Sequence, residues 1–328
     1  MLSIGVQTKN VIEDSCPEEG YVRLRGMGFN CVDFSLNCYL KNTDLYRQKR
    51  NSFFDRSAEE LKEYFAPHKK AAEVSGVRIH QMHMPYPVYV PGGTRTLNDY
   101  LWKEVAPKSL QICSFLECRY LVFHGFKMVR YLGSEEKEWE QTEKLIDFLA
   151  PTAKELGIVL CMENLYDGFG GHLTEGPGCS VRKAVERIDR INEKYRTEVL
   201  GFCFDTGHAN LVGIDMESFL TALGSRLKVL HIHDNDGISD LHQIPFVFTK
   251  SRENAPSTDW DGFIRGLRKI NFDQTLSFET APALDAFPKA LRQDALELIA
   301  KCGKYFADEI CRTETVSANN DEKSKFFS

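Results

Sequence analysis

The chain has 328 residues, of which 42% are hydrophobic and 27% are charged, figures that are ordinary for a globular protein. Its net charge of −6 argues against a nucleic-acid partner, because phosphate binding needs a clustered basic surface. No apolar run approaches the roughly 20 residues that cross a bilayer, and residues 1–6 lack the basic start and long apolar stretch of a secretion signal. We therefore expect a cytoplasmic protein that binds neither nucleic acid nor membrane.

Eight short runs rich in Val, Ile, Leu, Phe and Cys recur along the chain. Each is continuously apolar rather than alternating, which is typical of parallel strands buried on both faces. The runs are 3–8, 31–36, 77–84, 120–125, 158–164, 200–206, 228–234 and 275–280. Eight such runs, separated by helical stretches, predict a closed (β/α)₈ TIM barrel rather than an open sheet.

Helical periodicity fills the stretches between these runs. Residues 58–74 predict a helix with Ser57 as its N-cap and Gly76 just beyond its end. Two further helices are predicted at 138–156 and 260–269. The alternation of strand and helix indicates consecutive βαβ units.

The sequence indicates one α/β domain. Residues 9–14 follow the first strand and lack the Gly-x-Gly-x-x-Gly pattern of a dinucleotide-binding sheet, so that fold is excluded. No linker rich in Pro, Gly or Ser divides the chain. We expect residues 1–312 to form a single catalytic barrel and residues 313–328 to form a disordered tail.

Polar residues gather where the predicted strands end or just beyond. In a parallel barrel these carboxyl ends all point at one mouth, so the side chains should converge. The set comprises His83, His124, Glu163, Asp205, His208, His231, His233, Asp240, His242 and Glu279.

Three carboxylates in this set carry the strongest signal. Glu163, Asp205 and Glu279 each follow an apolar strand, and a buried charge is costly unless it is paired or coordinated. A lone histidine or aspartate at a strand end is more often a cap or a hydrogen-bonding group than a ligand. Three carboxylates at one mouth, however, would repel one another unless a cation lay among them. The group therefore predicts a metal site.

The motifs at these strand ends resemble those of the xylose-isomerase-like barrel superfamily. They are Glu163-Asn164, Asp205-Thr206-Gly207-His208, His231-Ile232-His233-Asp234 and Phe278-Glu279, and the resemblance runs from the first strand to the helix after the eighth. That superfamily contains sugar isomerases and epimerases, inosose dehydratases and apurinic-site endonucleases.

The resemblance implies a set of metal ligands. Ketose epimerases of the superfamily hold one divalent ion with two Glu, one Asp and one His, which correspond here to Glu163, Glu279, Asp205 and His233. His233 is preferred to His231 as the second histidine of the His-x-His pair. An oxygen-rich shell with one imidazole favours Mn²⁺, with Co²⁺, Mg²⁺ or Zn²⁺ as alternatives.

The resemblance also implies a reaction, the abstraction of a proton next to a sugar carbonyl through a metal-stabilised enolate. A cation on the carbonyl oxygen acts as a Lewis acid, and a nearby carboxylate or imidazole takes the proton. The expected catalytic groups are Glu163, Glu279, His124 and His208. The expected substrate-binding groups are His83, His231, Asp240, His242, Tyr86 and Phe246.

Two departures from the epimerase pattern leave the net reaction open. Ser239 stands where those enzymes carry a substrate-gripping Arg, and the loop 244–248 is apolar and aromatic instead of Gly-x-Gly. A lyase of the same superfamily is therefore an alternative: a dehydratase, or the catalytic subunit of a C-glycoside deglycosidase acting on a 3-oxo-glycoside. The loop aromatics are equally well explained as packing. We expect a homo-oligomer, with an added small subunit as the alternative.

A nuclease and a binding protein are the remaining alternatives. The superfamily's endonucleases bind three Zn²⁺ with five His, two Glu and two Asp. The resemblance gives each position a counterpart here: His83, His124, Glu163, Asp205, His208, His233, Asp240, His242 and Glu279. The acidic net charge and the lack of a basic, aromatic-interleaved loop argue against bent DNA as substrate. A metal-free binding protein would leave the carboxylates without a cation and is the least supported alternative.

Overall fold

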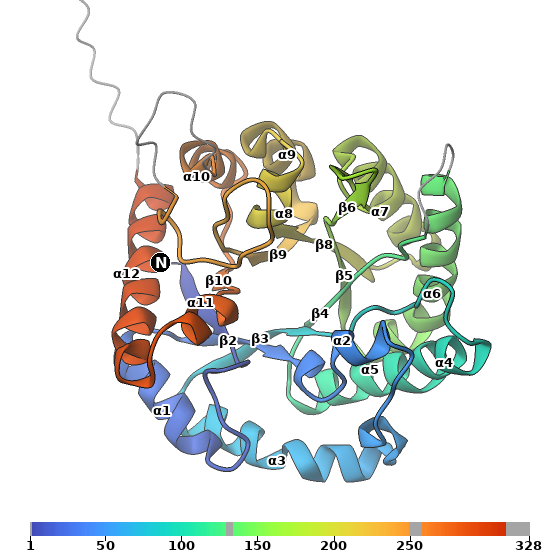
Figure 1. Cartoon of the computed structure of the whole chain (residues 1–328), viewed down its shortest axis with the longest axis horizontal. Coiled ribbons are helices and arrows are strands. Elements are labelled where there is room, and N and C mark those ends of the chain that lie inside the picture. Colours follow the sequence, from blue (N-terminus) through green and yellow to red (C-terminus); the bar gives the residue numbers. More distant parts are fainter. Residues whose placement is uncertain (1, 129–133, 249–257, 313–328) are drawn as a thin grey trace, which may run out of the picture.

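The computed structural model describes residues 2–128, 134–248 and 258–312 (Figure 1). Within these ranges eight parallel strands form one sheet in the order β10-β1-β2-β3-β4-β5-β8-β9. The strands are β1 (Ser3–Gln7), β2 (Cys31–Ser35), β3 (Arg78–His83), β4 (Tyr120–Phe123), β5 (Val159–Glu163), β8 (Leu200–Asp205), β9 (Leu227–His231) and β10 (Thr275–Phe278).

The sheet closes on itself between β9 and β10. The residue after β9, Ile232, bridges to Phe278 in parallel, and its N–H donates to the Ser277 carbonyl at 2.8 Å. Its carbonyl in turn accepts from the Glu279 N–H at 3.1 Å. The predicted single-domain (β/α)₈ barrel is therefore confirmed.

A helix follows almost every strand and covers the outside of the barrel, as Figure 1 shows. The main helices are α1 (Pro17–Met27), α3 (Ala58–Ser75), α5 (Ala106–Phe115), α6 (Ser134–Leu156), α7 (Val181–Tyr195), α9 (Met216–Leu223), α10 (Trp260–Lys269) and α12 (Arg292–Cys311). Shorter helices are α2 (Asn42–Leu45), α4 (Arg95–Tyr100), α8 (Thr206–Leu211) and α11 (Ala281–Ala286). None of the described helices combines the length and apolar character that crossing a bilayer requires.

Local sequence explains where α3 begins and ends. Ser57 forms a capping box, in which its hydroxyl accepts from the Glu60 N–H while the Glu60 carboxylate accepts from the Ser57 N–H. Gly76 ends the helix in the left-handed conformation at φ 70°, which costs glycine little. The helix predicted at 58–74 is confirmed, as are those at 138–156, which extends back to Ser134, and at 260–269.

Two register shifts, one between β2 and β3 and one between β8 and β9, change which side chains are paired near the mouth of the barrel. Between β2 and β3 the pairing steps from Val32–Ile79 to Asp33–Gln81, and His80 is skipped. Between β8 and β9 it steps from Phe202–Leu227 to Cys203–Val229. Such bulges are frequent beside active sites. After the second shift Asp205 and His231 become register partners at the mouth.

The predicted strands begin within one residue of the observed ones and run one to three residues too long. A hairpin of β6 (Tyr166–Phe169) and β7 (His172–Glu175) was not predicted, although its Gly170-Gly171 turn is a recognised hairpin signal. The predicted tail at 313–328 lies outside the described residues.

Candidate metal centre

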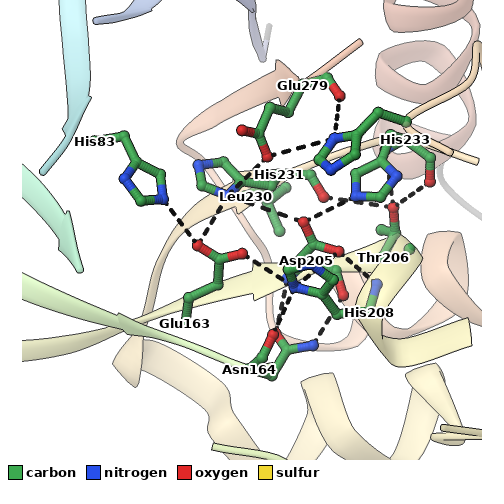
Figure 2. Close-up of polar contacts among 12 residues, drawn as sticks. His83, Glu163, Asn164, Asp205, Thr206, His208, Leu230, His231, His233 and Glu279 are labelled. Carbon is green, nitrogen blue, oxygen red and sulfur yellow. Dashed lines mark hydrogen bonds and ion pairs between the residues drawn. The ribbon is translucent and has the colours of Figure 1, made fainter. Parts of the chain in front are cut away.

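Glu163, the last residue of β5, is the centre of the polar cluster at the mouth (Figure 2). Its side chain is only 1% exposed, and Oε2 lies 3.3 Å from both His83 Nε2 and His124 Nε2. Its other oxygen, Oε1, lies 3.1 Å from His208 Nδ1. One carboxylate therefore contacts imidazoles from β3, from the residue after β4 and from α8.

Asp205 ends β8 and caps α8 directly. Its Oδ1 accepts from the His208 N–H at 2.6 Å, which fixes the first turn of the helix. The His208 ring is held as well, because its Nδ1 lies 2.9 Å from the Asn164 carbonyl oxygen. The Asn164 amide bonds both the N–H and the carbonyl of Asp205, at 2.8 and 2.9 Å. The carboxyl ends of β5 and β8 are thereby tied together.

His231 lies among the three carboxylates that the sequence singled out. Its Nδ1 is 3.2 Å from Glu163 Oε2, 3.4 Å from Glu279 Oε2 and 4.0 Å from Asp205 Oδ2. The ring is fully buried, yet within the described part of the chain this nitrogen has no hydrogen-bond partner. Three carboxylate oxygens around one unsatisfied imidazole nitrogen fit a divalent cation with mixed oxygen and nitrogen ligands.

His233, the histidine preferred from the sequence, lies to one side of this group. Its Nε2 is 3.0 Å from Asp205 Oδ2, and its ring stacks on His242 with centroids 3.9 Å apart. Asp240 bridges the same region, because its Oδ2 lies 3.2 Å from His242 Nε2 and 3.4 Å from His208 Nε2. The distances favour His231 over His233 as the partner of all three carboxylates.

Charge in this cluster is balanced by imidazoles. Burial raises the pKa of Glu163, but nearby histidines, His231 first, outweigh this effect and hold the pKa well below its ordinary value. The pKa of Asp205 is lowered in the same way, against burial, by His208. The pKa of His208 is raised well above its ordinary value, because Asp205 and Asp240 outweigh the burial of the ring. A bound cation would take over the role of these imidazole protons.

A cavity of about 210 Å³ opens above the carboxylates. Several of the predicted substrate-binding and catalytic residues line it, together with residues that the sequence did not indicate, namely Asn42, Tyr46, Lys127, Leu165 and Tyr166. The predicted residues on its wall are His83, Tyr86, His124, Glu163, His208, Asp240, His242 and Glu279.

Two predicted substrate contacts are not among the described residues that line the cavity. His231 is fully buried beneath the cavity, between the carboxylates. Phe246 packs outward against Phe306, Trp260 and Tyr305, with ring centroids 5.3 to 5.6 Å apart. Its ring therefore packs against the outer helices α10 and α12, which supports the packing explanation of the apolar loop.

The sequence matches the Xylose isomerase-like TIM barrel family over residues 23–302, and the chain belongs to that family. An inosose isomerase from Bacillus velezensis is 24% identical over 229 residues, 68% of this chain and 76% of that protein. A probable endonuclease 4 from Methanoculleus marisnigri is 31% identical over 183 residues, 52% of this chain and 60% of that protein. An uncharacterized protein from Sinorhizobium fredii is 34% identical, but the match covers only 27% of its length.

Solved structures of sugar epimerases share the fold. D-allulose 3-epimerase from Methylomonas sp. superposes with a TM-score of 0.63 at 15% identity, covering 93% of this chain and 98% of the epimerase. The IOLI protein with a bound zinc atom gives a TM-score of 0.58 at 15% identity, with 94% and 98% covered. At these identities the likeness establishes the barrel alone.

Gly207→Ala tests how tightly the mouth is packed. A Cβ at this position would collide with the His233 ring, so the ring must move and loosen its bond to Asp205. We expect a loss of about 1–3 kcal/mol in the free energy of unfolding, the usual cost of overpacking, measured by urea denaturation. Gly26→Ala in α1 is the control, because nothing lies within 4 Å of a Cβ there. Equal stability of the two variants would contradict the packing argument.

Proposed function

We propose that the protein is a divalent-metal-dependent sugar isomerase or epimerase that removes a proton next to a carbonyl group. The observation that carries the proposal is the buried, unsatisfied His231 nitrogen facing Glu163, Asp205 and Glu279 at the floor of the cavity. At about 210 Å³ the cavity is smaller than the about 300–1,000 Å³ typical of drug-sized ligands, which favours a compact molecule such as a single sugar.

The proposed ligands are Glu163, Asp205, His231 and Glu279, with His231 in place of the His233 expected from the sequence. A bound divalent cation would supply Lewis acidity toward the substrate carbonyl, as Mn²⁺ or a similar ion does elsewhere. The three carboxylates would balance the charge of the cation. Asn164 and the cap of α8 keep Asp205 in position. The identity of the metal stays a prediction.

We assign proton transfer to His124 and His208. His124 contacts Oε2 of Glu163, and His208 contacts Oε1 of the same carboxylate. Burial lowers the pKa of His124 more than the neighbouring Glu163 raises it, which favours the neutral ring that can accept a proton. The pKa of His208 is shifted in the opposite direction. Asp205 and Asp240 raise it more than burial lowers it, which favours the protonated ring that can donate a proton. Pairs of groups with pKa values pushed apart are the usual basis for acid and base roles. Glu163 and Glu279 are the carboxylates that would share this work.

Glu279→Gln tests the metal site. Loss of one ligand charge should lower the metal content of the purified protein, measured by mass spectrometry, and abolish hydrogen–deuterium exchange from solvent into keto-sugars. Glu193→Gln, on the exposed face of α7, is the matched control and should retain both. Circular dichroism should be unchanged in each variant. Full metal occupancy in Glu279→Gln would contradict the ligand assignment.

His124→Asn and His208→Asn test the proton-transfer roles. Each should lower kcat by about 10²–10⁴-fold, the usual share of one positioned acid or base, while metal content changes far less than in Glu279→Gln. His172→Asn on the exposed hairpin serves as control. If both variants raise only KM, the two rings bind substrate hydroxyls and the carboxylates act alone.

A nuclease is the second candidate, because one observation favours it. Possible ligand atoms within 4.8 Å of one another form several groups at the mouth, including His83-His124-Glu163, Asp205-His231-Glu279 and His208-His233-Asp240-His242. These groups contain all nine side chains that correspond to the three-metal endonuclease set. The small volume of the cavity and the acidic net charge of the chain favour the sugar enzyme.

The number of bound ions separates the two candidates. We expect one tightly bound ion per chain and no cleavage of abasic DNA, measured by metal analysis and by a nuclease assay on an abasic duplex. Three ions together with cleavage would overturn the proposal. A lyase would instead show elimination products from a 3-oxo-glycoside. The homo-oligomer, the added small subunit and the cytoplasmic location stay predictions.

A further inference from the structure

A further carboxylate lies beneath the proposed metal ligands. Asp33, in the middle of β2, is 2% exposed, and its Oδ2 lies 2.9 Å from Nε2 of the fully buried His231. β2 and β9 are not neighbours in the sheet, because β10 and β1 lie between them. The contact therefore crosses the interior of the barrel between two strands that do not pair with each other.

The β2–β3 register shift holds this carboxylate in place. It makes Gln81 the register partner of Asp33, and the Gln81 amide nitrogen donates to Asp33 Oδ2 at 3.0 Å. The same nitrogen donates to the Leu230 carbonyl at 3.2 Å, next to His231 in sequence. Gln81 thus fixes Asp33 against the strand that carries the histidine.

The chemistry of the contact sets the state of the imidazole. Asp33 Oδ2 accepts a hydrogen bond from the Gln81 amide, so it serves as an acceptor toward His231 as well, and His231 Nε2 carries the proton of this contact. Nδ1 is then the nitrogen left to face Glu163, Asp205 and Glu279. A histidine that donates its other ring N–H to a carboxylate is held in one orientation and is a more basic metal ligand.

We propose that Asp33 is a positioning residue for metal binding: it fixes the tautomer and ring orientation of His231 so that Nδ1 is presented to the cation. The inference rests on the proposed metal site but not on the sugar reaction. A purely structural ion pair in the barrel interior would make a different prediction, since its loss would change stability and leave the intrinsic metal affinity unaltered.

Asp33→Asn is the central test. The amide keeps the shape of the side chain but weakens the acceptor, so the affinity for Mn²⁺ or Zn²⁺ should fall about 10–100-fold, the usual effect of losing such a partner. The metal-free protein is titrated with each ion in competition with a chelating indicator, and its melting temperature is measured in parallel. Asp189→Asn is the control, because this exposed carboxylate pairs with Arg226 far from the mouth in the fold.

Gln81→Met provides a second variant should Asp33→Asn fold poorly. It removes both donor contacts that hold Asp33 and Leu230 together, and metal affinity should fall several-fold while the fold is retained. Wild-type affinity in folded Asp33→Asn or in Gln81→Met would overturn the inference. Metal binding by the wild type without isomerase activity would overturn the proposed function alone, and absence of any metal binding would overturn both.

Discussion

The mouth of this barrel depends on the mutual repulsion of carboxylates that share one buried space. Glu163, Asp205 and Glu279 converge on His231, and Asp240 lies beside Asp205 across His233. Carboxylates packed this closely in a low-dielectric interior cannot all ionise without a counter-charge. Imidazoles supply this charge in part, and the divalent cation that we propose would supply it in a form that can also act on a substrate. The need for a positive charge beside the carboxylates explains why histidines surround them.

The carboxylates and the groups that contact them are brought together by shifts in strand register. In a regular parallel pairing, side chains on neighbouring strands would meet at fixed steps, and Asp33 would face His80 rather than Gln81. One skipped residue in β3 and one in β9 correct the alignment on both sides of the barrel. The strands that carry the proposed ligands therefore also carry the groups that hold these ligands in place.

Sequence patterns were sufficient to predict the barrel and the convergence of the carboxylates. Apolar runs and helix caps are local signals, and the carboxyl ends of parallel strands must meet at one mouth. Register shifts are not local, so the alignment of Asp33 with Gln81 could not be derived from the sequence. Asp33 did leave a signal, as the sole acidic residue in an otherwise mostly apolar strand. Tyr46 and Lys127 reach the cavity from connecting segments, whose course depends on tertiary packing.

The two histidines of the His-x-His pair lie at different depths in the mouth and therefore have different neighbours. Two residues along a strand advance by about 6.6 Å and return to the same face, so both rings point inward but at different levels. His231 is the register partner of Asp205 and lies at the level of the three carboxylates, above Asp33. His233 lies two residues beyond the end of β9 and stacks on His242 beside Asp240. A motif alone cannot distinguish these levels, because both histidines satisfy the same alternation, whereas the register of β8 against β9 places His231 directly beside Asp205.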